Sequence, residues 1–220
     1  MIIRRLDRQD YLPVLEEMAG FSVSRLPETE DQIWLLQHNP VYTLGMNADP
    51  AHVIKTAIPV IKTDRGGQVT YHGPGQLVVY LLLDLQRLNI KVREYVSLLE
   101  QAMIELCNRF QIEGERKPGA PGIYVNNKKI GALGIRIKRG CCYHGIALNV
   151  NMDLSPYKNI NPCGYERLEV TQLSHFVYGL AVNDVSRLLI PILSDYLGMD
   201  TGYHTENSDP EGLSRGMLVA

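Results

Sequence analysis

The stretch RGGQVTYHGPGQ, residues 65–76, and the apolar run LVVYLLLDL that follows it, residues 77–85, decide the fold. The apolar run is too continuous for a strand with one face in water, so it predicts a strand in the middle of a sheet. Four glycines, a proline, a histidine and an arginine crowd the twelve residues before it. Such density indicates positive φ or a close approach of backbone to another group. A ligand site and a tight turn before the strand are both consistent with it, and no phosphate-binding spacing is present.

Length and composition predict one domain, residues 1–205, followed by a mobile tail, residues 206–220. The chain has 220 residues and 45% hydrophobic content. Its 22 basic and 24 acidic residues are scattered and give a net charge of −2, so nothing favours a nucleic-acid or membrane partner. The charged N-terminus and the short apolar runs predict a cytoplasmic protein. The four cysteines form no C-x-x-C pair and should be free thiols.

Apolar spacing predicts an α+β fold with a mixed, largely antiparallel sheet packed with helices, because strands and helices alternate without a regular βαβ order. The first helix should bury Leu12, Leu15 and Met18, and the last should be capped by Asn183 or Asp184 and kinked at Pro191. Asn126-Asn127 and Arg139-Gly140 should turn antiparallel strands. The strands are expected over residues 1–6, 33–36, 77–85, 123–125, 129–138 and 142–150, and the helices over residues 10–20, 92–110 and 184–197.

Cys163 stands between Pro162 and Gly164, a context typical of a loop, where catalytic groups often lie. It is either a nucleophile or a buried thiol, and as a nucleophile it needs a nearby base or cation. Cys107 lies on the apolar face of a predicted helix and should be a buried hydrophobe. No zinc-like ligand spacing is present, so neither a metal site nor a cofactor is expected. The residues that could activate Cys163 are His72, His144, Lys128 and Lys129.

Four blocks of the sequence form a long, ordered match to a known family: PVYTLG (40–45), RGGQVTYHGPGQLV (65–78), GAPGIYVNNKKIGALGIRI (119–137) and HGIALNVNMDLSPYKNINPCGY (144–165). They resemble the lipoate-protein ligase B family, the octanoyltransferases of lipoic acid synthesis. The resemblance covers most of the chain from about residue 33 to 175 and implies a biotin/lipoate protein ligase-like fold. It also implies transfer of octanoyl from acyl carrier protein to one lysine of a lipoyl domain. The expected acceptors are the lipoyl domains of 2-oxoacid dehydrogenases and the glycine cleavage H protein.

The resemblance also implies roles for individual residues. Cys163 would carry the acyl group as a thioester, and Lys129 would lower the pKa of that thiol. Some members have serine where this chain has Ala132, so only a backbone contact survives there. Backbone N–H groups near Leu133-Gly134 or Gly164 could stabilise the oxyanion. The residues implied to bind the acyl chain are Arg65, Gly66, Gly67, Gln68, Val69, Thr70, Tyr71, His72, Ala132, Leu133, Gly134, Gly145, Ile146 and Ala147.

Three other functions stay open at this point. An ATP-dependent lipoate or biotin ligase would share the fold but activate a free acid. A non-catalytic module could bind acyl chains or lipoyl domains. A cysteine hydrolase would pair Cys163 with His72 or His144 and use water as the acceptor. Arg136, Lys138 and Arg139 could form a basic patch for an acidic carrier protein, but solvated surface charge is the better explanation for them.

Overall fold

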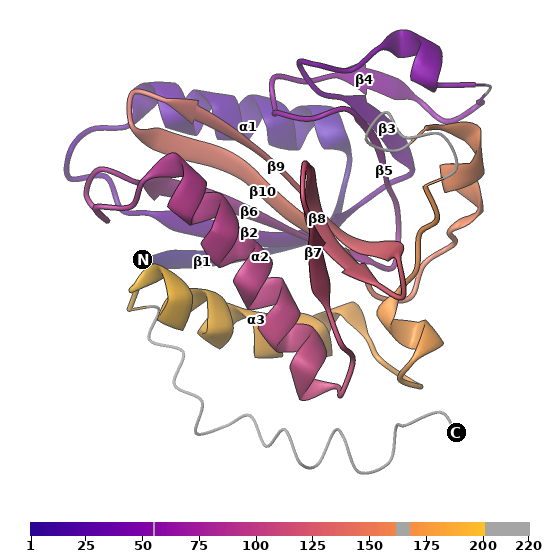
Figure 1. Ribbon diagram of the computed structural model, residues 1–220. Coiled ribbons are helices and arrows are strands. Elements are labelled where there is room, and N and C mark those ends of the chain that lie inside the picture. Colours follow the sequence, from indigo (N-terminus) through magenta and orange to yellow (C-terminus); the bar gives the residue numbers. More distant parts are fainter. Residues whose placement is uncertain (55, 162–167, 201–220) are drawn as a thin grey trace.

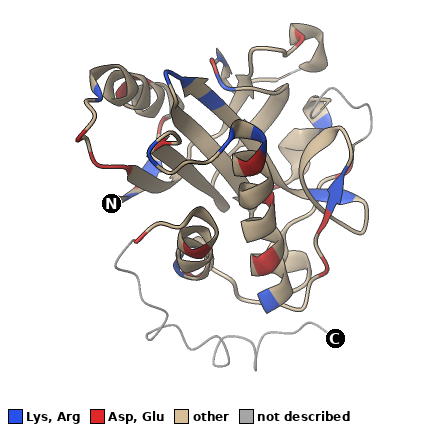
Figure 2. Ribbon diagram, turned by 60° about the vertical axis from the view of Figure 1, so that its left-hand side comes forward, with Lys and Arg blue, Asp and Glu red and all other residues tan. Residues whose placement is uncertain are grey.

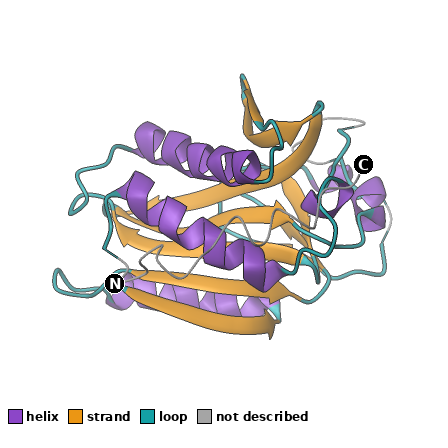
Figure 3. Cartoon of the chain, turned by 90° about the horizontal axis from the view of Figure 1, so that it is seen from below, coloured by secondary structure: helices purple, strands orange, loops and turns teal. Residues whose placement is uncertain are grey.

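The computed structural model describes residues 1–54, 56–161 and 168–200. In this part the chain forms a seven-stranded sheet, a three-stranded sheet and three α-helices (Figure 1). Helices cover both faces of the large sheet (Figure 3). The predicted α+β class is therefore confirmed. Cys163 and the tail at residues 206–220 lie outside the described residues.

The large sheet has the order β1-β2-β6-β10-β9-β8-β7, and β1 and β2 are its parallel pair. All its other neighbours are antiparallel, which confirms the expected sheet. The apolar run forms β6, which has a partner on each side. The strands are β1 (Ile2–Gln9), β2 (Gln32–His38), β6 (Gln76–Asp84), β7 (Glu115–Lys117), β8 (Ala120–Val125), β9 (Lys128–Lys138) and β10 (Cys141–Asn149).

Alternate side chains of β6 enter two different cores, which explains why residues 77–83 include no charged or amide side chain. Leu81 and the other odd-numbered residues of β6 pack with helices α2 (Val92–Arg109) and α3 (Val182–Leu197) on one face. Val78, Tyr80 and Leu82 face the other side, where α1 (Tyr11–Ser24) contributes Val14 and Met18. A strand buried on both faces can be apolar throughout.

The helices lie close to their predicted ranges, with two corrections. Helix α1 buries Tyr11, Val14 and Met18, while Leu12 is 48% exposed. Both sets of positions have helical spacing and apolar side chains, so the sequence pattern did not distinguish the faces. Helix α3 begins at Val182 after the N-cap Ala181, which makes no side-chain cap bond. The predicted caps were wrong because packing of Val182 on the core extends the helix.

The turns between the antiparallel strands are as predicted. Asn126 and Asn127 have φ of 49° and 66°, and Arg139 and Gly140 have φ of 53° and 83°. Positive φ at both central residues is the two-residue hairpin geometry that matches strand twist. Cys107 is fully buried on α2, as expected, and burial raises the pKa of its thiol to about 12.

The small sheet joins β3 (Val41–Leu44) to β4 (Val60–Lys62) and β5 (Val69–His72). The glycine-rich stretch runs from the segment after β4 through β5 and turns into β6. Gly75 in that turn has φ of 86°, and a Cβ there would overlap the carbonyl of Asn151. Both reasons for glycine, left-handed backbone and close approach, therefore apply at this turn. The stretch thus connects the two sheets.

Acidic and basic residues are interspersed over helices, strands and loops (Figure 2). This distribution agrees with the net charge of −2 and with the scatter in the sequence. In the described part, no helix combines the length and apolarity that a bilayer crossing requires.

A buried cluster of two histidines and two tyrosines lies where the two sheets meet α1. The rings of His38 and His72 are 5.8 Å apart, and Tyr11 stacks on His72 at 6.0 Å. Nε2 of His38 is 2.7 Å from the hydroxyl of Tyr80. Burial lowers the pKa of His38 to about 4 and that of His72 to about 3, so both rings are neutral at pH 7.

This cluster predicts a pH-dependent stability. Between the folded pKa and the ordinary value of 6.5, the unfolded state binds more protons than the folded state. The free energy of unfolding should therefore decrease as the pH falls below 6.5, by about 1.4 kcal/mol per pH unit for each histidine. Urea unfolding at a series of pH values between 7 and 5 measures this slope. His38→Gln should make the slope shallower, and parallel slopes in the two proteins would contradict the assignment.

Candidate acyl-binding site

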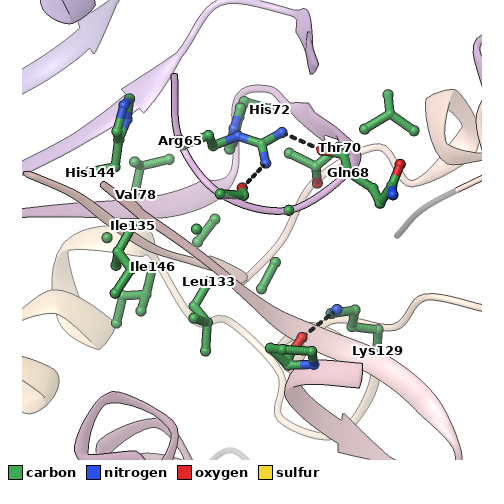
Figure 4. A pocket seen from close by; sticks show the side chains of 18 of the residues that line it. Arg65, Gln68, Thr70, His72, Val78, Lys129, Leu133, Ile135, His144 and Ile146 are labelled. Carbon is green, nitrogen blue, oxygen red and sulfur yellow. Dashed lines mark hydrogen bonds between the residues drawn. The ribbon is translucent and has the colours of Figure 1, made fainter. Parts of the chain in front are cut away.

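A cavity of about 380 Å³ lies between the glycine-rich stretch and the large sheet. Strands β6, β9 and β10 form its floor, and residues 65–70 form its roof (Figure 4). The structure brings nearly all the acyl-binding residues of the sequence resemblance to this cavity. Those that line it are Arg65, Gly66, Gly67, Gln68, Val69, Thr70, His72, Ala132, Leu133, Gly134, Gly145, Ile146 and Ala147.

Small side chains keep the floor open. Gly134 of β9 lies opposite Gly145 of β10, and the next pair on the same face is Ala132 opposite Ala147. A Cβ on Gly145 would overlap the carbonyl oxygen of Val79, so the strand pair β6–β10 requires glycine at this position. Four adjacent positions without large side chains leave a slot along the sheet surface.

The roof is pinned to the floor and to the small sheet by hydrogen bonds. The N–H of Gly66 donates to the carbonyl of Ile135 at 2.9 Å. Arg65, only 8% exposed, donates from Nη2 to the carbonyl of Thr43 at 2.7 Å and to that of Gln68 at 2.8 Å. The Arg65 side chain thus lines the cavity while its guanidinium holds the roof in place.

Tyr71 is the one acyl-binding candidate that the structure does not bring to the cavity. Its ring leaves β5 toward a separate apolar cluster, where it packs on Tyr42 and Tyr157 at ring distances of 5.5 and 5.6 Å. The side chain is 3% exposed. Tyr71 therefore stabilises the small sheet against the segment after β10.

Lys129 lies on the side of the cavity opposite His144 (Figure 4). Its side chain is held in place, with Nζ donating to the carbonyl of Pro121 at 2.7 Å and lying 5.3 Å from the ring centre of Tyr124. A carbonyl oxygen and an aromatic face both attract an ammonium group. Gly122 makes the room, since a Cβ there would lie 2.7 Å from Cε of Lys129.

The backbone around Lys129 is bonded to the segment that follows Cys163 in sequence. The N–H of Lys129 donates to the carbonyl of Glu169, and its carbonyl accepts from Thr171, both at 2.9 Å. On the other flank, the N–H of Asn161 donates to the carbonyl of His52 at 2.9 Å. Cys163 itself and Gly164 lie outside the described residues.

The other candidate activators of Cys163 have different surroundings. His72 is neutral because burial lowers its pKa to about 3. Burial likewise lowers the pKa of His144. Lys128 pairs with Glu169 at 3.2 Å. Neither histidine can therefore supply a positive charge near pH 7.

His144 and Tyr143 are adjacent in β10 yet both contact Asp64, directly before the roof. His144 has φ of 63°, a left-handed backbone that turns its ring onto that of Tyr143. Its Nε2 lies 2.9 Å from Oδ1 of Asp64, and the Tyr143 hydroxyl donates to Oδ2. The bond to His144 lowers the pKa of Asp64 to about 2. These contacts tie the start of the roof to the floor.

The remaining titratable groups in the described part of the chain do not converge on one point. Among the described residues, no cluster of three histidine, cysteine or acidic side chains could hold an ion. Cys142 is buried and donates to the carbonyl of Leu81, so it does not converge with His144. Burial raises the pKa of the Cys142 thiol to about 12.

Reasoning from the sequence missed several residues that line the cavity. Tyr80 is the one aromatic residue in the run at 77–85, a signal that could have marked it as special. Tyr11 gave no such signal, because the predicted buried face of its helix included the next residue, Leu12, instead. The further lining residues that were missed are Val78, Gly119, Ala120, Pro121 and Ile135.

Solved structures share this fold at low sequence identity. Lipoate-protein ligase A bound with ATP superposes with a TM-score of 0.74 at 16% identity, covering 97% of this chain and 92% of that one. Biotin protein ligase from Aquifex aeolicus in complex with biotin and ATP gives a TM-score of 0.57 at 12% identity, with 89% and 70% covered. These similarities establish the biotin/lipoate ligase-like fold and confirm the expected architecture.

Sequence relatives are much closer. The octanoyltransferase of Dechloromonas aromatica (strain RCB) is 51% identical over 202 residues, which are 91% of this chain and 98% of that protein. The octanoyltransferase of Aliivibrio fischeri (strain ATCC 700601 / ES114) is 48% identical, with 96% and 98% covered. The model of the lipoyl protein ligase A/B catalytic domain matches residues 16–193. The chain therefore belongs to the lipoyl protein ligase A/B catalytic domain family.

Proposed function

We propose that this chain is an acyltransferase that moves octanoyl from octanoyl-acyl carrier protein to a specific lysine of a lipoyl domain. The observation that carries the proposal is the cavity with a floor of glycine and alanine and with Lys129 on one side. Two relatives named octanoyltransferase, which are 51% and 48% identical to this chain, support octanoyl as the acyl group that is transferred. Residues 1–205 would act as one catalytic unit, with lipoyl domains of 2-oxoacid dehydrogenases and the glycine cleavage H protein as acceptors.

The cavity suits a linear saturated chain. Burial of a methylene contributes about 0.8 kcal/mol, so eight carbons against the β6–β10–β9 surface supply several kcal/mol. Roof and floor are joined through the bond from Gly66 to Ile135, which restricts the width of the slot. A narrow slot selects an unbranched acyl chain by shape, and no nucleotide is required when the acyl group arrives as a thioester.

The proposed chemistry has two transfers. The Cys163 thiolate attacks the carbonyl carbon of the donor thioester, a new C–S bond forms, and the carrier thiolate leaves and takes a proton from the Lys129 ammonium. The acceptor lysine amine then attacks the acyl-enzyme, the amide C–N bond forms and the C–S bond to Cys163 breaks. Lys129, now neutral, accepts the proton that the amine loses.

The first test is the acyl-enzyme itself. Incubation with octanoyl-acyl carrier protein should add one octanoyl group to the wild-type chain, measured by intact mass, and a lipoyl domain added afterwards should remove it. Hydroxylamine should also release the group because it is a thioester. Cys163→Ala should carry no adduct. Transfer that survives in Cys163→Ala, or that requires ATP and free octanoate, would contradict the proposal and favour an adenylating ligase.

The second test concerns Lys129. Lys129→Met removes the ammonium while keeping an unbranched side chain, so less of Cys163 should be thiolate. Alkylation of Cys163 by iodoacetamide at pH 7, followed by peptide mass mapping, should slow by about tenfold or more, and octanoyl transfer should fall by about a hundredfold. Lys128→Met is the matched control, because Lys128 pairs with Glu169. Equal alkylation rates in the two variants would exclude Lys129 as the activating cation.

The third test concerns the floor. Each methylene removed from the acyl chain should lower kcat/KM by about fourfold in the wild type. Ala132→Leu places a branched side chain on the floor, so octanoyl transfer should fall at least about tenfold while butanoyl transfer changes little. Ala51→Leu, at an exposed position outside the cavity, is the control. An unchanged chain-length profile in Ala132→Leu would place the acyl chain elsewhere.

A further inference from the structure

The peptide group between Pro121 and Gly122 is hydrogen-bonded at both of its ends, and one of those bonds holds Lys129. Its carbonyl oxygen accepts from Nζ of Lys129 at 2.7 Å. Its N–H donates to Oε1 of Glu100 at 2.8 Å. In a planar trans peptide these two groups point in opposite directions, and no cis peptide occurs in the described part of the chain. Glu100 and Lys129 therefore contact opposite ends of one peptide group.

The strand registers explain why this peptide group is available to side chains. Strand β8 pairs with β7 and with β9 in registers that skip Pro121 and Gly122. Both pairings shift register beside these residues, as they do at a β-bulge. Gly122 has φ of 119°, a conformation that L side chains rarely adopt. The irregularity thus leaves the N–H and the carbonyl of this peptide for the two side chains.

Glu100 lies on α2, is 8% exposed, and accepts a hydrogen bond at each carboxylate oxygen. Oε1 accepts from Gly122, and Oε2 accepts from Nε of Arg116 at 3.1 Å. Acceptance at both oxygens suits an ionised carboxylate. Nη2 of Arg116 also donates to the carbonyl of Ser97 at 2.9 Å, which ties the ion pair to the helix. The negative charge is therefore fixed behind the peptide, and Glu100 itself does not line the cavity.

A carboxylate at the N–H end of a peptide group strengthens the acceptor at its carbonyl end. The partial double bond lets the group polarise as a unit, so electron density moves toward the carbonyl oxygen. Along the bonds that connect them, Nζ of Lys129 and Oε1 of Glu100 are at most about 8 Å apart. An ammonium gains more from a polarised acceptor than a neutral amine does, because charge-assisted hydrogen bonds are about twice as strong. The bond at Nζ should therefore tighten when Lys129 gains a proton.

We propose that Glu100 is a positioning residue that acts on Lys129 through the Pro121–Gly122 peptide and favours the second transfer. This inference rests on the proposed function, in which neutral Lys129 accepts the proton that the acceptor amine loses. As the amide C–N bond forms and the C–S bond to Cys163 breaks, that proton reaches Nζ and restores the ammonium. Glu100 stays ionised, and no proton passes along the peptide. In the first transfer the ammonium gives up its proton instead, so the same polarisation brings no advantage there.

The test separates the two transfers, with the full chain and rapid-quench intact mass. Glu100→Gln keeps an oxygen that can accept from Gly122 but removes the charge. Formation of the acyl-enzyme from octanoyl-acyl carrier protein should change by less than about twofold. Removal of the octanoyl group by an added lipoyl domain should slow by about three- to tenfold. During turnover the acyl-enzyme should accumulate, and kcat should fall while KM for the carrier protein does not rise.

Glu105→Gln is the matched control. Glu105 lies on the same helix and pairs with Arg109 at 3.9 Å, and its substitution changes the net charge equally. We expect both transfers to keep their wild-type rates in this variant. In a Lys129→Met background, Glu100→Gln should have no further effect, because the group through which it acts is gone. Equal slowing of both transfers, or the same slowing with and without Lys129, would make Glu100 structural only and overturn the inference.

A spectroscopic measurement depends neither on turnover nor on the folding of a Glu100 variant. The amide proton signal of Gly122 should move upfield in Lys129→Met, because loss of the ammonium at the carbonyl end weakens the polarisation of the whole peptide. Lys128→Met should leave that signal in place. Identical Gly122 signals in the two variants would overturn the coupling. A wild-type chain that forms no acyl-enzyme would instead contradict the proposed function, while the Gly122 signal would still decide the coupling.

Discussion

The contact between the glycine-rich roof and strand β9 is the constraint on which the site depends. The N–H of Gly66 donates to the carbonyl of Ile135, and Arg65 ties the same loop to Thr43 of the small sheet. The approach is so close that a Cβ on Gly134 would lie 3.1 Å from the carbonyl oxygen of Gly66. The same close contact therefore needs glycine in both the roof and the floor, although these glycines come from two distant parts of the sequence.

Burial leaves the two histidines beside the cavity neutral, while the buried lysine there keeps a hydrogen-bond acceptor. His38 and His72 are neutral, and each ring has its tautomer set by a carbonyl or amide oxygen. Lys129 is buried but has a carbonyl acceptor and an aromatic face beside it. The two sides of the cavity thus differ in character. One side holds the ammonium group of Lys129, and the other holds the neutral ring of His72.

Much of the fold could be predicted from the sequence, because its strongest patterns have local causes. The run at 77–85 is apolar on both faces and became the doubly buried strand β6, and Asn126-Asn127 gave the positive φ of a two-residue hairpin. On α1, Leu15 and Met18 pack on the core as predicted, but Leu12 is exposed, because apolar residues occupy two overlapping helical spacings there. Helix α3 begins at Val182 because this residue packs on the core. No capping residue in the sequence indicates that start.

The site was less accessible to prediction from the residues alone. Glycine density indicated a close approach but not its partner, since the pairing of Gly134 with Gly145 depends on the register of β9 and β10. Family resemblance supplied those positions and also suggested Tyr71, whose ring packs on the small sheet. Tyr11 and Tyr80 belong to the cavity only because α1 and β6 meet β5 at the buried histidines.

The most direct measurement is a crystal structure of the octanoyl-loaded chain. If the cavity is the acyl site, density for the chain should continue from the Cys163 sulfur past Lys129 and lie across the Gly134–Gly145 pair beneath Gly66. Density that leaves the sulfur in another direction, with only water in the cavity above β6, β10 and β9, would contradict the account.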